Sequence, residues 1–252
     1  MGVPPRVSVI MPTYNHALHI RRAVDSVLRQ SYTNWELIVW DDGSTDNTGD
    51  IVGLYSDDRI YYRFDDNHGP SYARNRSAEL ARGDYLAFLD SDDEWMNGKL
   101  SAQVKVMDAY PQIDLLFADY MNVNAGERRT ARAFVQCSGA MKLLDVERID
   151  DGLFIVKGGI LQSLAVDDYV LPSAALLRRS ATSAAGVFNE HLRGPEDFEL
   201  LWRMGLTGVR FAYLDQPYLT RYKYANSLSS PSMSHCQNWL AALGACRRTG
   251  LS

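Results

Sequence analysis

Short apolar segments alternate with amphipathic ones through the first half of the chain, and no other feature limits the fold as much. The segments 7–11, 36–40, 60–64 and 85–89 are mainly apolar and rich in β-branched or aromatic residues, which is typical of strands buried in a parallel sheet. The segments between them carry apolar residues at helical spacing. This order predicts an α/β fold with a doubly wound, mostly parallel sheet and right-handed crossovers.

Acidic residues follow two of the predicted strands. Asp41 and Asp42 end the second strand, and Asp90 and Asp92 follow the fourth. Sheets of this kind bind ligands beyond the carboxyl ends of their strands, so these residues predict a ligand site. Two carboxylates on one sharp turn repel each other unless a cation lies between them, and oxygen ligands suit Mg²⁺ or Mn²⁺. The alternative is a turn whose aspartates only cap the next helix.

Three residues at the same predicted edge suit a nucleotide. Tyr14, after the first strand, offers an aromatic face on which a base can stack. The carboxylate of Asp42 can accept the imide N–H of uracil or thymine. Arg74, in a helix that opens with Gly-Pro, can bind a diphosphate together with the helix N-terminus. The plainer interpretations are a packing role for Tyr14 and a surface ion pair for Arg74.

A second acidic group opens a helix predicted from about residue 195 to 204. Glu196, Asp197 and Glu199 lie in its first turn, where acids commonly interact with the helix dipole. The functional interpretation makes Asp197 a general base that accepts a hydroxyl proton.

The second half is otherwise less regular. Residues 126–151 are polar and indicate a solvated loop, and residues 169–177 indicate a strand interrupted by Pro172. The final residues, 231–252, are expected to form a helical tail. Loops of this half select the acceptor in the functional interpretation, and the contacts expected there are Ser173, His191 and Arg193.

Composition excludes several classes of protein. The 26 basic and 31 acidic residues give a net charge of −5, which argues against a nucleic-acid partner. No apolar run is long enough for a transmembrane segment, and no signal-peptide pattern opens the chain. Three cysteines at unrelated spacings indicate reduced thiols in a cytoplasmic protein. The five histidines share no metal-ligand spacing, and His16 and His19 are expected at the surface.

Taken together, these segments resemble glycosyltransferase family 2, whose members are inverting, nucleotide-sugar-dependent enzymes of GT-A fold. The resemblance covers about residues 5–230 and rests on collinear motifs. They are Val7–Asn15, Glu36–Asp46, Asn67–Asn75, Gly83–Asp93 and the pair Glu196-Asp197.

The resemblance implies a donor site made by five residues of the first 95. Pro12 and Tyr14 would line the base, and Asp42 would hold the uracil or thymine edge of a UDP- or dTDP-sugar. Arg74 would approach the diphosphate, and Asp90 would contact the ribose.

The resemblance also implies the catalytic groups. Asp92 would ligate Mn²⁺ or Mg²⁺, and Asp197, supported by Glu196, would deprotonate the acceptor hydroxyl. The predicted domain spans residues 1–230, with a nucleotide-binding half to about residue 95 and an acceptor half after it. The implied activity is that of a hexosyltransferase in the synthesis of polysaccharide, lipopolysaccharide or another glycoconjugate.

Two features depart from the family pattern. Tyr224 stands where members often carry a histidine that helps at the metal or diphosphate. The Gln-x-x-Arg-Trp motif and membrane helices of processive synthases are absent from the sequence, so we expect transfer of a single sugar. A saccharide or glycolipid would be the acceptor, and a lipid-linked one leaves open a peripheral contact with the inner face of the membrane.

Two other functions stay open at this stage. The chain could be a non-catalytic nucleotide-sugar-binding domain derived from such an enzyme, which would agree with the altered Tyr224 position. A nucleotidyltransferase is disfavoured, because the glycine-rich basic loop of that class is missing.

Overall fold

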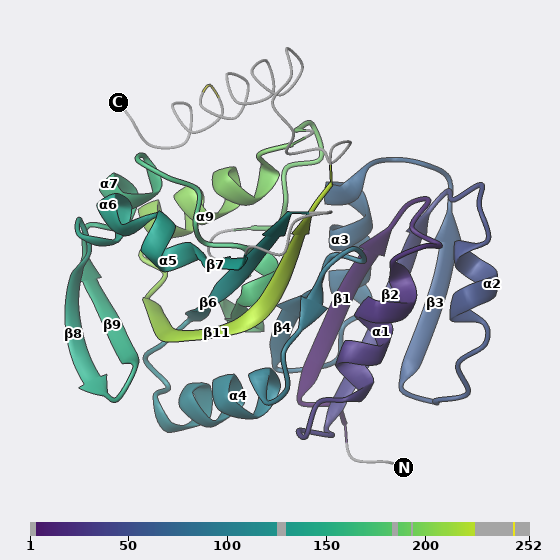
Figure 1. Cartoon of the computed structure of the whole chain (residues 1–252), viewed down its shortest axis with the longest axis horizontal. Coiled ribbons are helices and arrows are strands. Elements are labelled where there is room, and N and C mark those ends of the chain that lie inside the picture. Colours follow the sequence, from purple (N-terminus) through teal and green to yellow (C-terminus); the bar gives the residue numbers. More distant parts are fainter. Residues whose placement is uncertain (1–3, 125–129, 183–185, 193, 225–243, 245–252) are drawn as a thin grey trace.

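One sheet runs through the computed structural model in Figure 1, which describes residues 4–124, 130–182, 186–192, 194–224 and 244. Within these residues the eleven strands follow the order β3-β2-β1-β4-β10-β6-β11-β9-β8, while β5 pairs with β11 and β7 with β6. The strands are β1 (Val7–Thr13), β2 (Trp35–Asp42), β3 (Ile60–Asp65), β4 (Tyr85–Phe88), β5 (Glu94–Trp95), β6 (Leu115–Asn124), β7 (Thr130–Arg132), β8 (Asp145–Asp150), β9 (Leu153–Gly158), β10 (Leu176–Arg178) and β11 (Phe211–Lys223).

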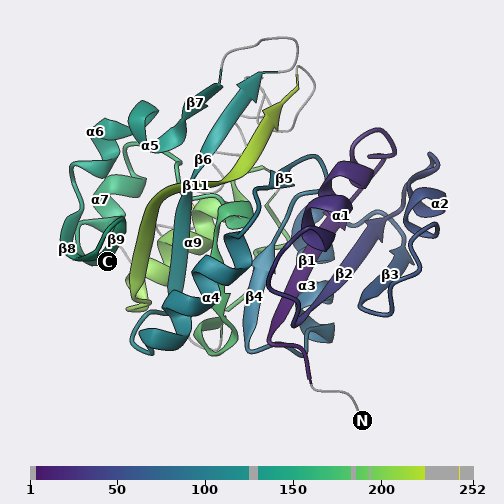
Figure 2. The same cartoon turned by 60° about the horizontal axis from the view of Figure 1, so that its bottom comes forward.

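Helices cover both faces of the sheet (Figures 1 and 2) because side chains of a strand alternate between its faces. Val7, Val9 and Met11 of β1 pack in one core with α1, α2 and α4, whereas Ile10 packs in the other core with α9 and the end of α3. The helices are α1 (Ile20–Leu28), α2 (Thr48–Val52), α3 (Pro70–Leu80), α4 (Lys99–Ala109), α5 (Ala133–Gln136), α6 (Ser138–Met141), α7 (Ile160–Leu164) and α9 (Glu196–Leu206), with 3-10 turns η1 (Pro172–Ala174) and η2 (Arg179–Ala181).

The predicted α/β fold with a mostly parallel, wound sheet is confirmed. Strands β3, β2, β1 and β4 are parallel to one another, and β11 is parallel to β6 along a long ladder. The short β10 lies between β4 and β6 and is antiparallel to both. The carboxyl ends of β1, β2 and β4 therefore meet at one edge, where the predicted donor residues lie.

The prediction of a solvated loop over residues 126–151 is wrong for most of that stretch. Among the described part, β7 pairs with β6, β8 pairs with β9, and α5 buries Ala133 and Phe134. Strand β8 lies at the end of the sheet and is largely exposed, so its sequence has the polar character of a loop.

The predicted strand over residues 169–177 is also mostly wrong. Only residues 176–178 form a strand, because Pro172 begins the 3-10 turn η1 instead. Proline fixes φ and has no N–H for a sheet ladder. The helix predicted at residues 195–204 is confirmed as α9, with Phe198, Leu201 and Met204 buried.

The division into two halves at about residue 95 stays a prediction, and a single sheet runs through both. The predicted tail, 231–252, lies outside the described residues except for residue 244. No helix in the described ranges combines the length and apolar character that a membrane crossing needs.

Candidate active site

The turn after β4, residues 90–94, is the centre of the candidate site. The amide of Leu89 still bonds to Ile10 O of β1 (3.0 Å), so the turn starts where the parallel ladder ends. Asp93 N then donates to Asp90 O (3.0 Å) and closes the turn. The sheet thus presents Asp90 and Asp92 at its carboxyl edge, as the sequence predicts.

Side chains from three other elements hold the start of this turn. Arg74 of α3 binds the Asp90 carboxylate (2.7 Å), and the Ser173 hydroxyl of η1 accepts the Asp90 amide (3.1 Å). His16, in the loop before α1, has its Nδ1 2.6 Å from Ser91 Oγ. Asp90 and Ser91 are therefore fixed by groups far apart in the sequence.

The remaining residues of the turn are held equally well, with one exception. Arg22 of α1 donates to the main-chain oxygen of Asp92, and Tyr222 N of β11 donates to the Asp93 carboxylate (3.2 Å). The Tyr222 hydroxyl binds Glu94 (3.0 Å). The exception is the Asp92 carboxylate: within the described ranges, no residue besides Asp92 itself donates a hydrogen bond to it. The turn is therefore held from several elements, while the Asp92 carboxylate lacks such a contact.

Electrostatics distinguish the first two aspartates of the turn. Burial alone would raise the pKa of Asp90, but Arg74 outweighs it and holds that pKa below its ordinary value. Burial and the neighbouring Asp90 raise the pKa of Asp92. A divalent cation would relieve this repulsion, and carboxylate oxygen is a donor that Mn²⁺ and Mg²⁺ accept. No three acidic, histidine or cysteine side chains converge on a metal position in the described ranges. The chemistry of the Asp92 carboxylate fits one oxygen ligand of such a cation.

Arg74 joins the turn to the second half of the molecule. Arg74 is 6% exposed, and its guanidinium binds Asp90 at 2.7 Å and Glu196 of α9 at 2.8 Å. The second oxygen of Glu196 accepts the Gly194 amide (2.8 Å). The plainer interpretation of Arg74 as a surface ion pair is wrong, since this pair is buried.

Asp197 follows Glu196 in the first turn of α9. Burial raises its pKa well above the ordinary value, and the neighbouring carboxylates of Asp168 and Glu196 raise it further. Asp168 itself has its pKa raised to about 6, mainly by burial. Its Oδ1 is buried without a hydrogen-bond partner in the described structure. A carboxylate held at a raised pKa is a good acceptor for a hydroxyl proton.

Sequence reasoning missed Asp168 and Arg221. Arg221 of β11 is the positive charge among these acids, since Asp93, Asp168 and Asp197 all raise its pKa against the effect of burial. Asp168 lies in an irregular polar stretch, so no periodicity singles it out. Arg221 lies in the segment that the sequence analysis used only for its departure at Tyr224.

The predicted base-binding residues lie at the ends of β1 and β2. Thr13 is level with Asp41 in the parallel register, so Pro12 and Tyr14 are close to Asp42 along the edge. Tyr14 is exposed, whereas Asp42 is buried and accepts the amides of His68 and Gly69, both at 2.8 Å. Asp42 thus fixes the loop before α3, a role that the sequence analysis did not include.

A match to a family model shows which protein family the chain belongs to. The model for "Glycosyl transferase family 2" matches residues 8–171, which include β1, β2, β4 and the turn with Asp92. The chain is a family 2 glycosyltransferase.

Known proteins agree with this assignment. The glycosyltransferase is 42% identical over 119 residues to the UDP-Glc:alpha-D-GlcNAc-diphosphoundecaprenol beta-1,3-glucosyltransferase WfgD of Escherichia coli, a match that covers 47% of each chain. The matched stretch therefore spans less than half the length of that relative.

Solved structures support the GT-A fold. The complex of S. aureus TarS 1-349 with UDP-GlcNAc has a TM-score of 0.72 at 22% identity and covers 98% of this chain and 68% of that one. The mannosyltransferase PcManGT of Pyrobaculum calidifontis, in complex with GDP-Man and Mn2+, has a TM-score of 0.67 at 18% identity and covers 99% and 66%.

Two of the three predicted acceptor residues lie within the described structure. Ser173 is buried, and its hydroxyl accepts the Asp90 amide. His191 is exposed in the turn that precedes α9. Arg193 lies outside the described residues.

Tyr224 stands where family members often carry a histidine, but the imidazole of His19 lies beside it. Its ring stacks on His19 at a centroid distance of 4.5 Å, and Arg22 donates to its hydroxyl (3.1 Å). His16 lies 5.8 Å from His19, centroid to centroid, and contacts Ser91. The prediction that His16 and His19 are plain surface residues is wrong, because both lie beside the turn with Asp92.

Proposed function

We propose that this glycosyltransferase moves a single sugar, with inversion, from a UDP- or dTDP-sugar to a hydroxyl of a saccharide or glycolipid acceptor. One observation carries the proposal: the turn 90–94 is held by several elements, while no other described residue donates a hydrogen bond to the Asp92 carboxylate. A turn that served only to cap the next helix would supply that cap, but α4 begins at Lys99 with Gly98 at its N-cap and no side-chain cap bond.

Each residue at the carboxyl edge of the sheet binds one part of the nucleotide-sugar donor. Pro12 and Tyr14 line the base, and Asp42 accepts its imide N–H with lone pairs that the two loop amides do not use. Asp90 contacts the ribose. Arg74 orients Asp90 and contributes positive charge near the diphosphate.

Mn²⁺ or Mg²⁺ would be held by Asp92 together with diphosphate oxygens, and when bound it would stabilise the negative charge of the departing nucleoside diphosphate. Asp197 removes the proton from the acceptor hydroxyl, while Glu196 and Arg74 fix the start of α9. The hydroxyl then attacks the anomeric carbon from the face opposite the diphosphate, so the configuration inverts.

Support for the acceptor class comes from a relative. WfgD is named for a diphosphoundecaprenol-linked acceptor, which supports a lipid-linked saccharide and a role in cell-envelope polysaccharide synthesis. A cytoplasmic enzyme in peripheral contact with the membrane would meet such an acceptor.

The test of the function compares wild type with Asp92→Asn. We expect wild type to release UDP or dTDP from one nucleotide-sugar of a panel, with Mn²⁺ and a saccharide acceptor. Asp92→Asn keeps the side-chain shape but removes the charge, so its affinity for UDP with Mn²⁺ should fall about 100-fold, measured by calorimetry.

The matched control for Asp92→Asn is Asp151→Asn, which changes a fully exposed aspartate on the β8–β9 turn and should leave the affinity unchanged. Equal UDP affinity of Asp92→Asn with and without Mn²⁺, at the wild-type value, would contradict the metal role. Tight UDP binding by wild type without transfer to any acceptor would favour the non-catalytic binding domain.

Asp168→Asn should move the pH dependence of the reaction. The charge of Asp168 raises the pKa of Asp197, so its removal lowers that pKa and leaves the base deprotonated at lower pH. We expect the acidic limb of kcat/KM against pH to shift to lower pH. A limb that stays in place would show that Asp197 is not the group that titrates.

A further inference from the structure

Three successive main-chain carbonyls of the 173–175 segment each accept a hydrogen bond from a side chain. Trp95 Nε1 donates to Ser173 O (2.8 Å), and Gln103 Nε2 donates to Ala174 O (2.9 Å). Lys99 Nζ donates to Ala175 O (3.2 Å). All three donors come from the short stretch of β5 and α4. Carbonyls that have no strand partner are thereby satisfied one by one.

The donors are themselves buried and joined. Lys99 and Gln103 are both 0% exposed, lie one helical turn apart, and are linked by a bond of 2.7 Å from Nζ to Oε1. Lys99 Nζ also lies 4.2 Å from the Trp95 ring centroid. No described carboxylate pairs with Lys99, and burial lowers its pKa well below the ordinary value. Burying a lysine is costly unless its amine is hydrogen-bonded, and Gln103 Oε1 and Ala175 O accept those bonds here.

The 173–175 segment contacts the candidate site through the Ser173 hydroxyl. Ser173 Oγ accepts the Asp90 amide, the first N–H beyond the β1–β4 ladder. Without Ser173, this amide would have no partner among the described residues at the point where the turn begins. The Ser173 hydroxyl therefore binds the chain at the point where it leaves the sheet on its way to Asp92.

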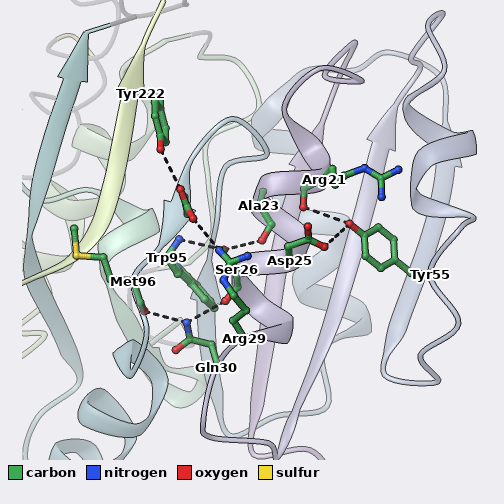
Figure 3. A network of polar contacts seen from close by, with 11 residues as sticks. Arg21, Ala23, Asp25, Ser26, Arg29, Gln30, Tyr55, Trp95, Met96 and Tyr222 are labelled. Atoms are coloured by element: carbon green, nitrogen blue, oxygen red, sulfur yellow. Dashed lines mark hydrogen bonds and ion pairs between the residues drawn. The ribbon is translucent and has the colours of Figure 1, made fainter. Parts of the chain in front are cut away.

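Trp95 is fixed from the other side by α1, as Figure 3 shows. Its main-chain amide donates to Ser26 Oγ (3.1 Å), which in turn donates to Ala23 O (2.7 Å). Gln30 Nε2 donates to Met96 O (3.0 Å). The same helix supplies the Arg22 contact to Asp92 O. Trp95 is therefore hydrogen-bonded both to η1 and to α1, the helix that also contacts Asp92.

We propose that Ser173 is a positioning residue for the Asp90–Asp92 turn, and that Trp95, Lys99 and Gln103 hold Ser173 in register for this role. The proposal rests on the proposed function, because it assigns Ser173 to donor binding and not to acceptor recognition. If the role of Ser173 were purely structural, its replacement would reduce the amount of folded protein, but the folded fraction would bind the nucleotide with wild-type affinity.

The first experiment compares Ser173→Ala with Ser173→Thr. Alanine removes the acceptor of the Asp90 amide, whereas threonine keeps the hydroxyl. We expect Ser173→Ala to weaken UDP binding in the presence of Mn²⁺ about 10-fold, and Ser173→Thr to restore most of the affinity, as calorimetry on the folded proteins would show. Equal affinities of wild type and Ser173→Ala would overturn the proposal.

The second experiment tests whether Trp95 acts through Ser173. Trp95→Phe removes the indole N–H but keeps a ring, and its matched control is Trp202→Phe, whose indole N–H has no partner in the described structure. We expect Trp95→Phe to weaken UDP binding and Trp202→Phe to leave it unchanged. The double variant Trp95→Phe/Ser173→Ala should bind UDP like Ser173→Ala alone. Fully additive losses would show that Trp95 does not act through Ser173.

Amide hydrogen exchange separates this proposal from the proposed function. The Asp90 amide should exchange faster in Ser173→Ala than in wild type and regain protection in Ser173→Thr. Unchanged exchange at Asp90 would overturn the positioning role. Faster exchange in Ser173→Ala, with no UDP binding by wild type, would support the link to the turn and contradict only the proposed function.

Discussion

Replacement of Asp197 by asparagine should lower kcat by roughly 10²–10⁴-fold, the usual contribution of a general base. Asparagine has nearly the same shape but cannot accept the hydroxyl proton. The Kd for UDP with Mn²⁺ should stay at the wild-type value, because Asp197 is assigned to the acceptor and not to the donor. Steady-state kinetics and calorimetry on the same preparations measure the two quantities.

Asp151→Asn is again the control, because that aspartate is fully exposed on the β8–β9 turn. A kcat for Asp197→Asn close to that of this control would exclude Asp197 as the base. If the UDP affinity of Asp197→Asn fell in parallel with kcat, the substitution would have disturbed the donor site through Glu196 and Arg74.

Replacement of Arg74 by methionine should lower the free energy of unfolding by about 3–5 kcal/mol, because it leaves Asp90 and Glu196 without their buried partner. Urea unfolding at neutral pH measures the loss. Arg210→Met is the matched control, since Arg210 pairs with Asp114 while 54% exposed, and should cost no more than about 1 kcal/mol. Equal losses in the two variants would show that burial does not strengthen the Arg74 pair.

The same ion pair gives a pH dependence with a definite sign. Arg74 holds the folded-state pKa of Asp90 below its unfolded value, so the pair stabilises the fold above the unfolded pKa and loses this effect as pH falls through the folded one. Wild type should therefore lose more stability on acidification than Arg74→Met does. Parallel stability–pH curves for the two proteins would contradict this account.

The fold and the carboxyl edge of the sheet were open to prediction because both depend on local patterns. Apolar strands alternate with helices, and polar residues follow the strands directly, so the topology alone brings the ends of β1, β2 and β4 together. The order of motifs also indicated the family, which the family model confirms. The roles of Tyr14, Asp42 and Asp92 remain predictions.

The second half resisted prediction because its contacts join distant residues. Asp168 and Asp197 are 29 residues apart in the sequence but interact in the fold, and no local spacing in the sequence predicts this. Ser173 was expected on the acceptor side, yet η1 carries its hydroxyl to the Asp90 amide. Strands at the end of the sheet, such as β8, have polar sequences because one side faces water.

The insertion of β10 between β4 and β6 has a consequence for synthesis on the ribosome. Residues 176–178 fill the gap between a strand that ends at Phe88 and one that begins at Leu115. Until they emerge, the nascent N-terminal layer keeps an unpaired edge at β4, a surface prone to wrong association. The completed sheet, and with it the Ser173 contact, must therefore form late in translation.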